Sequence, residues 1–206
     1  VPLNFNKSNI VKLITDHFRV EHRAPELAKW EAFTGKIRSN LPEVPIALVG
    51  KYTGLKDAYY SVIEAVKTAG YHNNVKIDIV WIDAEKIEKD GEEGEKEWEH
   101  LKKAKGIVVM GGFGKRGAEG KIAVARYARE NNIPYLGLCL GMQIAAIEFA
   151  RHVLGLADAN SAEFDPATKN PVIYLMESQK NFHKKGGTMR LGDYVCRIRK
   201  DSKSFV

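Results

Sequence analysis

The sequence predicts an α/β fold with a mostly parallel central sheet flanked by helices. Short apolar runs at 46–49 and 107–110 are typical of strands buried on both faces. Stretches with apolar residues at helical spacing separate these runs, and this order favours parallel strands joined by right-handed crossovers. A third apolar run, at 135–138, leads directly into Cys139 and a further helical pattern. This junction is typical of a nucleophile elbow, the sharp strand-to-helix turn that raises a reactive side chain above a sheet.

Length and composition suit one α/β domain with an appendage, because the chain has 206 residues. No apolar stretch approaches the ~20 residues needed to span a bilayer, and the first residues lack the pattern of a signal peptide. The two cysteines, Cys139 and Cys196, are too few for a disulfide scaffold. We therefore expect a cytoplasmic protein that does not contact a membrane. The absence of an initiator methionine indicates a piece of a longer chain.

The net charge of +6 is concentrated near the C-terminus, where residues 180–203 contain eight Lys or Arg and two Asp. Such a segment can meet nucleic acid, a phosphate ligand or an acidic protein surface, or it can be a solvated basic face. It lacks the interleaved aromatic residues on which bases stack, so we do not expect nucleic acid as a partner. A nucleotide phosphate is therefore still a candidate ligand of this basic segment.

The chain begins with a predicted appendage at 1–44, followed by a main domain at 45–206. Apolar residues between Ile10 and Phe18 predict one short helix, and Pro25 is expected to open a second that carries Trp30 and Phe33. Residues 41–45 are expected to form a linker. Two helices this short need a surface on which to pack.

Alternating patterns continue through the main domain. Gly70 is expected to cap the first helix of this domain, and the charge-dense segment 83–105, with nine acids and six lysines, is expected to be mostly exposed loop and helix. The expected strands are 46–49, 75–81, 107–110, 135–138, 171–175 and 194–199, and the expected helices are 58–69, 120–130 and 141–154.

Chemistry is expected at the carboxyl ends of the strands, where sites form in parallel sheets. Cys139 can serve as a nucleophile, and the helix N-terminus behind it favours the thiolate. Gly137 and Gly141 leave room for a crowded turn. The amide of Leu140 and the glycine-rich loop 111–114 can donate to an oxyanion. The alternative is a buried structural cysteine, the common fate of free Cys.

A general base for this cysteine is missing from the pattern. None of the histidines is followed two positions later by Glu or Asp, and each is better explained as a surface or packing residue. We therefore nominate none of them. They are His17, His22, His72, His100, His152 and His183.

Four segments together resemble the glutaminase domain of the CTP synthase family. They are GGFGKRG at 111–117, GLCLGMQ at 137–143, ANSAEFD at 159–165 and GGTMRLG at 186–192. The second alone indicates only a class I glutamine amidotransferase, whose fold is flavodoxin-like, whereas the third and fourth point to CTP synthase. The resemblance covers essentially the whole chain, and 1–44 is similar to that family's linker between its synthetase and glutaminase domains.

The resemblance implies a reaction and a set of residues. Cys139 would attack the side-chain amide of L-glutamine, release ammonia and form a thioester that water hydrolyses, and the ammonia would pass to the synthetase domain for conversion of UTP to CTP. A carboxylate at Glu163 suits the substrate ammonium. The segment 186–192 resembles the region associated with the lid and with GTP activation. The implied glutamine-binding positions are Gly112, Leu140, Gly141, Met142, Gln143 and Glu163.

The sequence departs from the family in one respect. The family's H-x-E pair and a carboxylate-binding arginine lie further along than Val206, so we expect this chain alone to be inactive or weakly active. We expect no cofactor or metal in this domain. ATP and magnesium would belong to the synthetase domain, GTP would be an allosteric activator, and the full enzyme would be a homotetramer. The alternatives are an amidotransferase subunit of another synthetase and a non-catalytic regulatory module of the same fold.

Overall fold

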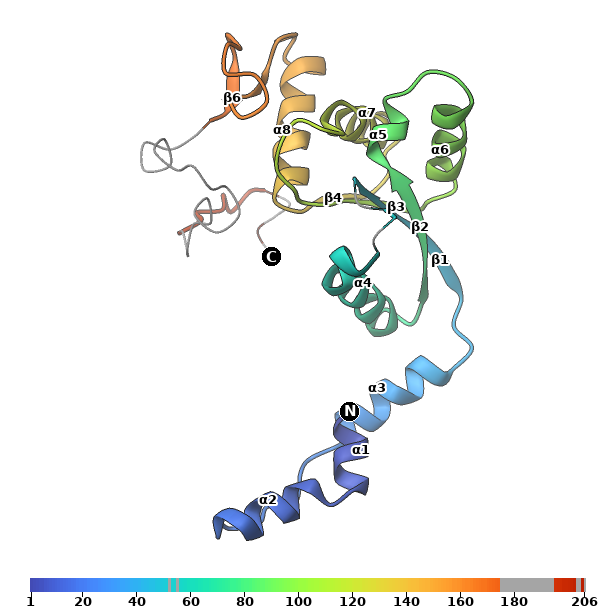
Figure 1. The fold of residues 1–206 in the computed structure, drawn as a ribbon, viewed down its shortest axis with the longest axis vertical. Coiled ribbons are helices and arrows are strands. Elements are labelled where there is room, and N and C mark those ends of the chain that lie inside the picture. The colour runs from blue at the N-terminus through green and yellow to red at the C-terminus, as the bar shows by residue number, and fades with distance from the viewer. Residues whose placement is uncertain (52, 55, 175–194, 203–204, 206) are drawn as a thin grey trace.

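The fold is taken from a computed structural model, which describes residues 1–206 except 52, 55, 175–194, 203–204 and 206. Its centre is a four-stranded sheet in the order β2-β1-β3-β4, and every pairing is parallel (Figure 1). The strands are β1 (Glu43–Gly50), β2 (Lys76–Asp83), β3 (Gly106–Val109) and β4 (Tyr135–Gly137). The predicted α/β class and parallel sheet are confirmed.

The inner strands β1 and β3 are buried on both faces over 47–50 and 106–109, which explains why they are continuous apolar runs. Ala47 and Val49 of β1 belong to one core cluster, Leu48 between them belongs to another, and all three are fully buried. Side chains alternate between the faces of a strand, so a strand covered on both sides needs apolar residues at every position.

Helices form the outer layers. On one face lie α5 (Ala84–Ile87), α6 (Glu92–Lys102) and α7 (Ala118–Glu130), and on the other lie the 3₁₀ turn η1 (Lys56–Tyr59) and α4 (Tyr60–His72) (Figure 1). Helix α8 (Leu140–His152) follows β4 and packs on α7. Ile87 and Leu101 are buried, so the charge-dense segment contributes to the core as well as to the surface.

A second sheet pairs β5 (Asn160–Ser161) with β6 (Pro171–Ile173) in parallel. Strand β6 confirms 171–173 of the strand predicted at 171–175, whereas Tyr174 has no regular structure and residue 175 lies outside the described residues. The strand predicted at 194–199 is wrong over 195–199, because these residues have no regular structure and Val195 is 90% exposed. A segment with strand-like alternation still needs a paired neighbour to form a strand.

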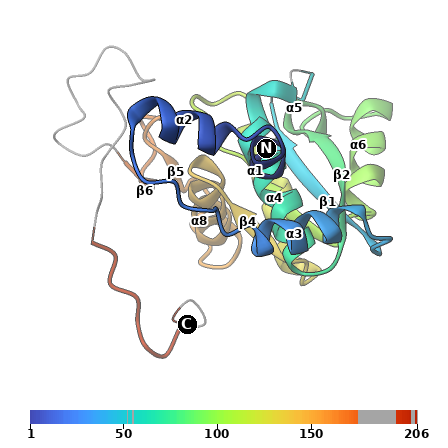
Figure 2. The ribbon, with the colours of Figure 1, turned by 90° about the horizontal axis from the view of Figure 1, so that it is seen from below.

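The N-terminal appendage contains α1 (Pro2–Lys7), α2 (Ile10–Phe18) and α3 (Ala28–Arg38), and it extends away from the sheet on the side of α4 (Figures 1 and 2). Helix α1 was not predicted. Pro25 lies before α3 rather than inside its first turn, so the predicted start of that helix is wrong. Phe33 of α3 contacts α4, with its ring centroid 6.0 Å from Tyr71 and 5.2 Å from His72.

Two local predictions are corrected by long-range packing. Gly70 lies inside α4, which ends at the cap Asn73, and a Cβ at Gly70 would come 2.6 Å from Cγ1 of Ile77. The glycine therefore allows α4 to approach β2 and does not end the helix. Strand β1 begins at Glu43, so the predicted linker 41–45 is partly strand. No helix among the described residues is long and apolar enough to cross a bilayer.

Candidate active site

Cys139 lies in the sharp turn between β4 and α8. Its backbone has φ 53° and ψ −107°, a conformation that costs energy for a residue with a side chain, and its side chain is exposed. The prediction of an elbow is confirmed, and the alternative of a buried cysteine is wrong. Strain held in place at an exposed cysteine is typical of a functional position.

The glycines on either side of Cys139 are required by close backbone contacts. A Cβ at Gly137 would lie 2.4 Å from the carbonyl carbon of Gly141, and a Cβ at Gly141 would lie 2.1 Å from the carbonyl oxygen of Val109. Side chains at these positions would push α8 away from β4 and β3. The pair therefore allows the helix to start directly over the ends of the strands.

The glycine-rich loop after β3 borders the cysteine. A Cβ at Gly111 would lie 3.4 Å from the Cβ of Cys139, and one at Gly112 would lie 3.9 Å from Cδ2 of Leu140. Gly112 has φ 150° and Gly114 has φ 77°, values that favour glycine. The structure thus brings together Cys139, Leu140 and the loop, although they are distant in sequence.

Glu163 reaches the same loop from the segment that follows β5. Its Oε1 accepts a hydrogen bond from the backbone N–H of Gly114, with N and O 3.0 Å apart. The backbone N–H of Glu163 donates to Oγ of Ser161 at 3.2 Å, which holds the turn in place. The carboxylate therefore lies against the glycine-rich loop, although 49 residues separate it from Gly114.

Residues 140–143 form the first turn of α8. The backbone N–H of Gly141 donates to the Leu138 carbonyl at 2.9 Å, and those of Met142 and Gln143 donate to the Cys139 carbonyl at 3.1 and 3.3 Å. The side chain of Leu140 is 2% exposed and packs in the core, so only its backbone can face a ligand. Gly141 is buried, and its carbonyl accepts from the Tyr135 hydroxyl at 2.7 Å. Met142 is 57% exposed and Gln143 is half-buried.

Two lysines that the sequence analysis missed bind backbone carbonyls at the start of the glycine-rich loop and within it. Nζ of Lys121, on α7, donates to the Met110 carbonyl at 2.9 Å, and Nζ of Lys51, just after β1, donates to the Phe113 carbonyl. Lys121 is 1% exposed. The signal in the sequence was a lysine within the apolar stripe of α7 formed by Ala118, Ile122 and Ala125.

Burial changes the acidity of Lys121. Removal from water, and secondarily the charge of Lys51, lower its pKa from the usual 10.5 to about 8, while the negative charge of Cys139 opposes this change. Most Lys121 side chains are therefore protonated at pH 7. The ammonium of Lys121 therefore lies close enough to Cys139 for the charge of the cysteine to affect it.

The lowered pKa predicts how stability depends on pH. Between pH 8 and 10.5 the unfolded chain binds more protons at Lys121 than the folded chain, so the free energy of unfolding should rise with pH. Relative to Lys121→Met, we expect the wild type to gain about 2 kcal/mol between pH 7.5 and pH 10. Urea unfolding of both proteins at the two pH values measures this difference. Parallel pH dependence in the two proteins would contradict the assignment.

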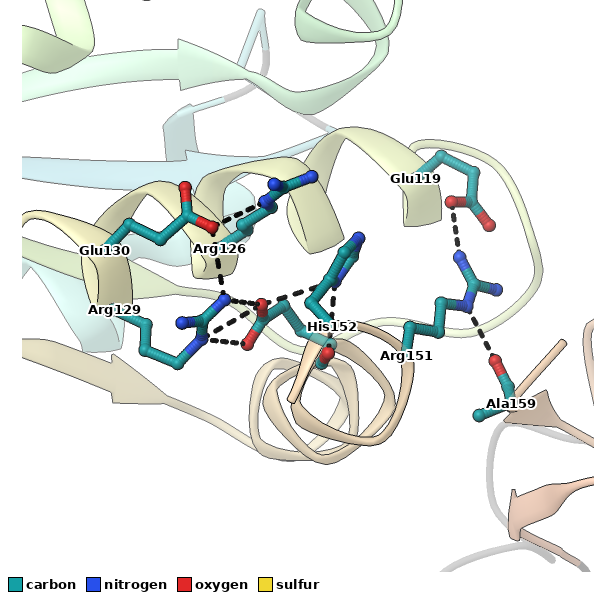
Figure 3. Close-up of polar contacts among 8 residues, drawn as sticks. Glu119, Arg126, Arg129, Glu130, Arg151, His152 and Ala159 are labelled. Atoms are coloured by element: carbon teal, nitrogen blue, oxygen red, sulfur yellow. Dashed lines mark hydrogen bonds and ion pairs between the residues drawn. The ribbon is translucent and has the colours of Figure 1, made fainter. Parts of the chain in front are cut away.

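The described histidines lie in packing or surface positions, as the sequence predicted. The ring of His72 stacks on Phe33, and Nδ1 of His152 lies 3.3 Å from Oε1 of Glu148 (Figure 3). His152 ends the helix that Cys139 begins, so about 20 Å separates the two backbones. His183 and the segment 186–192 lie outside the described residues.

An ion-pair network holds α8 against α7. Arg129 Nε lies 3.1 Å from both carboxylate oxygens of Glu148, and its Nη2 lies 2.7 Å from Oε1 (Figure 3). The Glu148 side chain is only 3% exposed. Arg151 donates to the Ala159 carbonyl at 2.7 Å and to Glu119 at 2.8 Å, which connects α8 with β5 and the start of α7 (Figure 3). These contacts support the helix that carries the elbow.

A cavity of about 850 Å³ lies beside the start of α7, next to the glycine-rich loop. Acidic and basic side chains both line it, so its charge does not select one class of ligand. Its lining includes Glu85, Glu88, Lys115, Arg116, Glu119 and Asp165.

Comparisons with known proteins agree with this geometry. A family model described as glutamine amidotransferase class-I matches residues 54–206. The chain is 51% identical over 207 residues to the CTP synthase of Cytophaga hutchinsonii and 48% identical over 205 residues to that of Hydrogenobaculum sp.. Both alignments include 100% of this chain. They include only 38% of the Cytophaga protein and 37% of the Hydrogenobaculum protein.

A solved structure is similar as well. It is the glutaminase domain of Trypanosoma brucei CTPS with bound acivicin, at 42% identity and a TM-score of 0.60. The match covers 67% of this chain and 52% of that one. The family match extends from residue 54 through the glycine-rich loop and the Cys139 elbow to the C-terminus. The chain therefore belongs to the class I glutamine amidotransferase family.

Proposed function

We propose that this chain is the glutaminase unit of a CTP synthase and that Cys139 is its nucleophile. The observation that carries the proposal is the exposed Cys139 in a strained elbow, bordered by Gly111 of the glycine-rich loop. Similarity to CTP synthases along the whole chain favours this enzyme over an amidotransferase subunit of another synthetase. The exposed elbow argues against a non-catalytic module.

The proposed reaction begins when the Cys139 sulfur attacks the side-chain amide carbon of glutamine. An S–C bond forms and the carbonyl oxygen gains negative charge, which the amides of Gly112 and Leu140 would stabilise. The C–N bond then breaks, and the nitrogen leaves as ammonia with the proton that the thiol gave up. Water hydrolyses the thioester, which yields glutamate and restores the thiol.

Substrate recognition is assigned to residues around the same turn. The Glu163 carboxylate, which already accepts a hydrogen bond from the Gly114 amide, would also bind the substrate ammonium. Met142 and Gln143 would border the ligand from α8. Leu140 and Gly141 would also border the glutamine, and the missing side chain of Gly141 permits the turn as well. We also propose residues 1–44 as a linker and 45–206 as the glutaminase domain.

The wider enzyme completes the proposal. Ammonia would pass to a synthetase domain that binds ATP and magnesium and converts UTP to CTP. GTP would act as an allosteric activator, and the enzyme would assemble as a homotetramer. The chain covers 37% of its Hydrogenobaculum relative, which leaves room for such a domain in the full polypeptide.

The nucleophile can be tested by labelling with acivicin, the compound bound in the trypanosomal relative. In the full-length polypeptide that carries this chain, we expect Cys139→Ala to abolish both labelling and ammonia release from glutamine. The matched control is Cys196→Ala, which removes the other exposed cysteine and should leave both unchanged. Intact mass and peptide mapping measure the labelling. A Cys139→Ala protein that still releases ammonia from glutamine would overturn the proposal.

A further inference from the structure

Lys121 lies behind the glycine-rich loop and takes no part in the reaction as described above. The residue is 1% exposed, and its ammonium donates to the carbonyl of Met110, the residue that leads into the loop. The neighbouring positions on this face of α7, Ala118, Ile122 and Ala125, are apolar. A buried cation costs stability, and a methionine would fill a similar space without that cost. The charge at this position therefore calls for a reason other than packing.

The contact with Met110 sets the direction of a loop amide. The Met110 carbonyl and the Gly111 N–H belong to one trans peptide unit, so they point in opposite directions. By holding the carbonyl, Lys121 fixes the orientation of the N–H next to Cys139. The other end of the loop is held in the same way, because Lys51 donates to the Phe113 carbonyl while the Gly114 N–H donates to Glu163.

Charge provides a second connection between Lys121 and Cys139. The negative charge of the Cys139 thiolate raises the pKa of Lys121, whereas burial and the charge of Lys51 lower it. Opposite charges attract, so the Lys121 ammonium and a thiolate at Cys139 would stabilise each other.

We propose that Lys121 is a positioning residue for the cysteine chemistry. It orients the glycine-rich loop through the Met110 carbonyl and stabilises the Cys139 thiolate through its charge. The inference depends on the proposed function only in taking Cys139 as the nucleophile. It extends that function by giving a part of the thiolate's activation to a side chain on α7, outside the elbow and the loop.

The test measures the pH profile of Cys139 alkylation by iodoacetamide in the full-length polypeptide, with peptide mapping to separate Cys139 from Cys196. Lys121→Met removes the charge and the hydrogen-bond donor, Lys121→Gln keeps a donor, and Lys121→Arg keeps the charge. The matched control is Lys102→Met, which removes an exposed lysine of α6. We expect the midpoint for Cys139 to rise in the Met and Gln variants, with alkylation at pH 7 slowed about tenfold. Lys121→Arg and Lys102→Met should keep the wild-type midpoint.

Acivicin separates the two parts of the proposal, because its reaction also depends on the loop. We expect Lys121→Met to slow acivicin labelling more than Lys121→Gln, since only glutamine can still donate to Met110. Folding is checked by circular dichroism, and if the Met variant does not fold, the comparison of Gln with Arg decides. Equal midpoints in folded Gln, Arg and wild-type proteins would overturn the proposal, and so would failure of all three variants to fold. Loss of the nucleophile assignment would show itself separately, as ammonia release by Cys139→Ala.

Discussion

Gly141→Ala is expected to destabilise the protein by about 3 kcal/mol or more and to abolish acivicin labelling of Cys139. The new Cβ would lie 2.1 Å from the carbonyl oxygen and 2.9 Å from the carbonyl carbon of Val109. Both atoms are backbone of the central sheet, so they cannot rotate away as a flexible side chain could. Relief requires α8 to separate from β3, which would also move Cys139 away from the glycine-rich loop.

Gly35→Ala is the matched control for this substitution. Gly35 lies in α3, and a Cβ there would meet nothing within 4 Å. Alanine is preferred to glycine inside a helix, so this variant should be unchanged or more stable by up to about 1 kcal/mol. Urea unfolding gives the free energies, and mass spectrometry gives the labelling. Wild-type stability in Gly141→Ala would show that α8 does not pack on β3 as closely as described.

Glu148→Gln is expected to destabilise the protein by about 3 kcal/mol. The carboxylate is almost fully buried and receives three contacts from Arg129, two at 3.1 Å and one at 2.7 Å. Glutamine has nearly the same shape but only one acceptor oxygen. One edge of the guanidinium would therefore face an NH₂ group, with donor against donor. The pair connects α7 with α8, so its loss should lower the unfolding midpoint of the whole domain.

The control for Glu148 is Glu130→Gln, which makes the same change in another carboxylate bound to Arg129. Glu130 lies 3.4 Å from Nη2 of Arg129 and is 45% exposed. Water replaces such a contact readily, so no measurable change is expected. Urea unfolding at pH 7.5 compares the two variants. Equal effects of the two substitutions would show that burial of Glu148 does not set the strength of its pairing.

Much of the central fold could be predicted because it depends on local patterns. Continuous apolar runs identified β1 and β3, and helical spacing identified α7 and α8. The glycines at 137 and 141 marked the elbow because only a crowded turn requires them at this spacing around Cys139. Errors occurred where a local signal competed with packing. Gly70 has the sequence context of a helix cap, yet it lies inside α4, where the absence of a side chain allows α4 to pack closely on β2.

The site was predictable where its residues are adjacent in sequence and less so elsewhere. The position of Cys139 at the start of α8 follows from the strand-to-helix pattern. The contact of Glu163 with Gly114 could not be predicted from local patterns, because only the resemblance to a family identified Glu163 as a site residue. Lys51 and Lys121 were missed, since lysine is usually exposed and neither belongs to a recognised motif.

The sequence by itself determined most of the succession of strands and helices in the main domain, the cysteine at the elbow and the glycines that permit its turn, because neighbouring residues set backbone conformation and side-chain periodicity. Only the tertiary structure decided which distant groups surround that cysteine. Lys121 approaches the glycine-rich loop from α7, and Glu163 approaches it from the segment after β5. Such contacts depend on how helices pack on the sheet, and burial then gives Lys121 a pKa that its sequence neighbours do not predict.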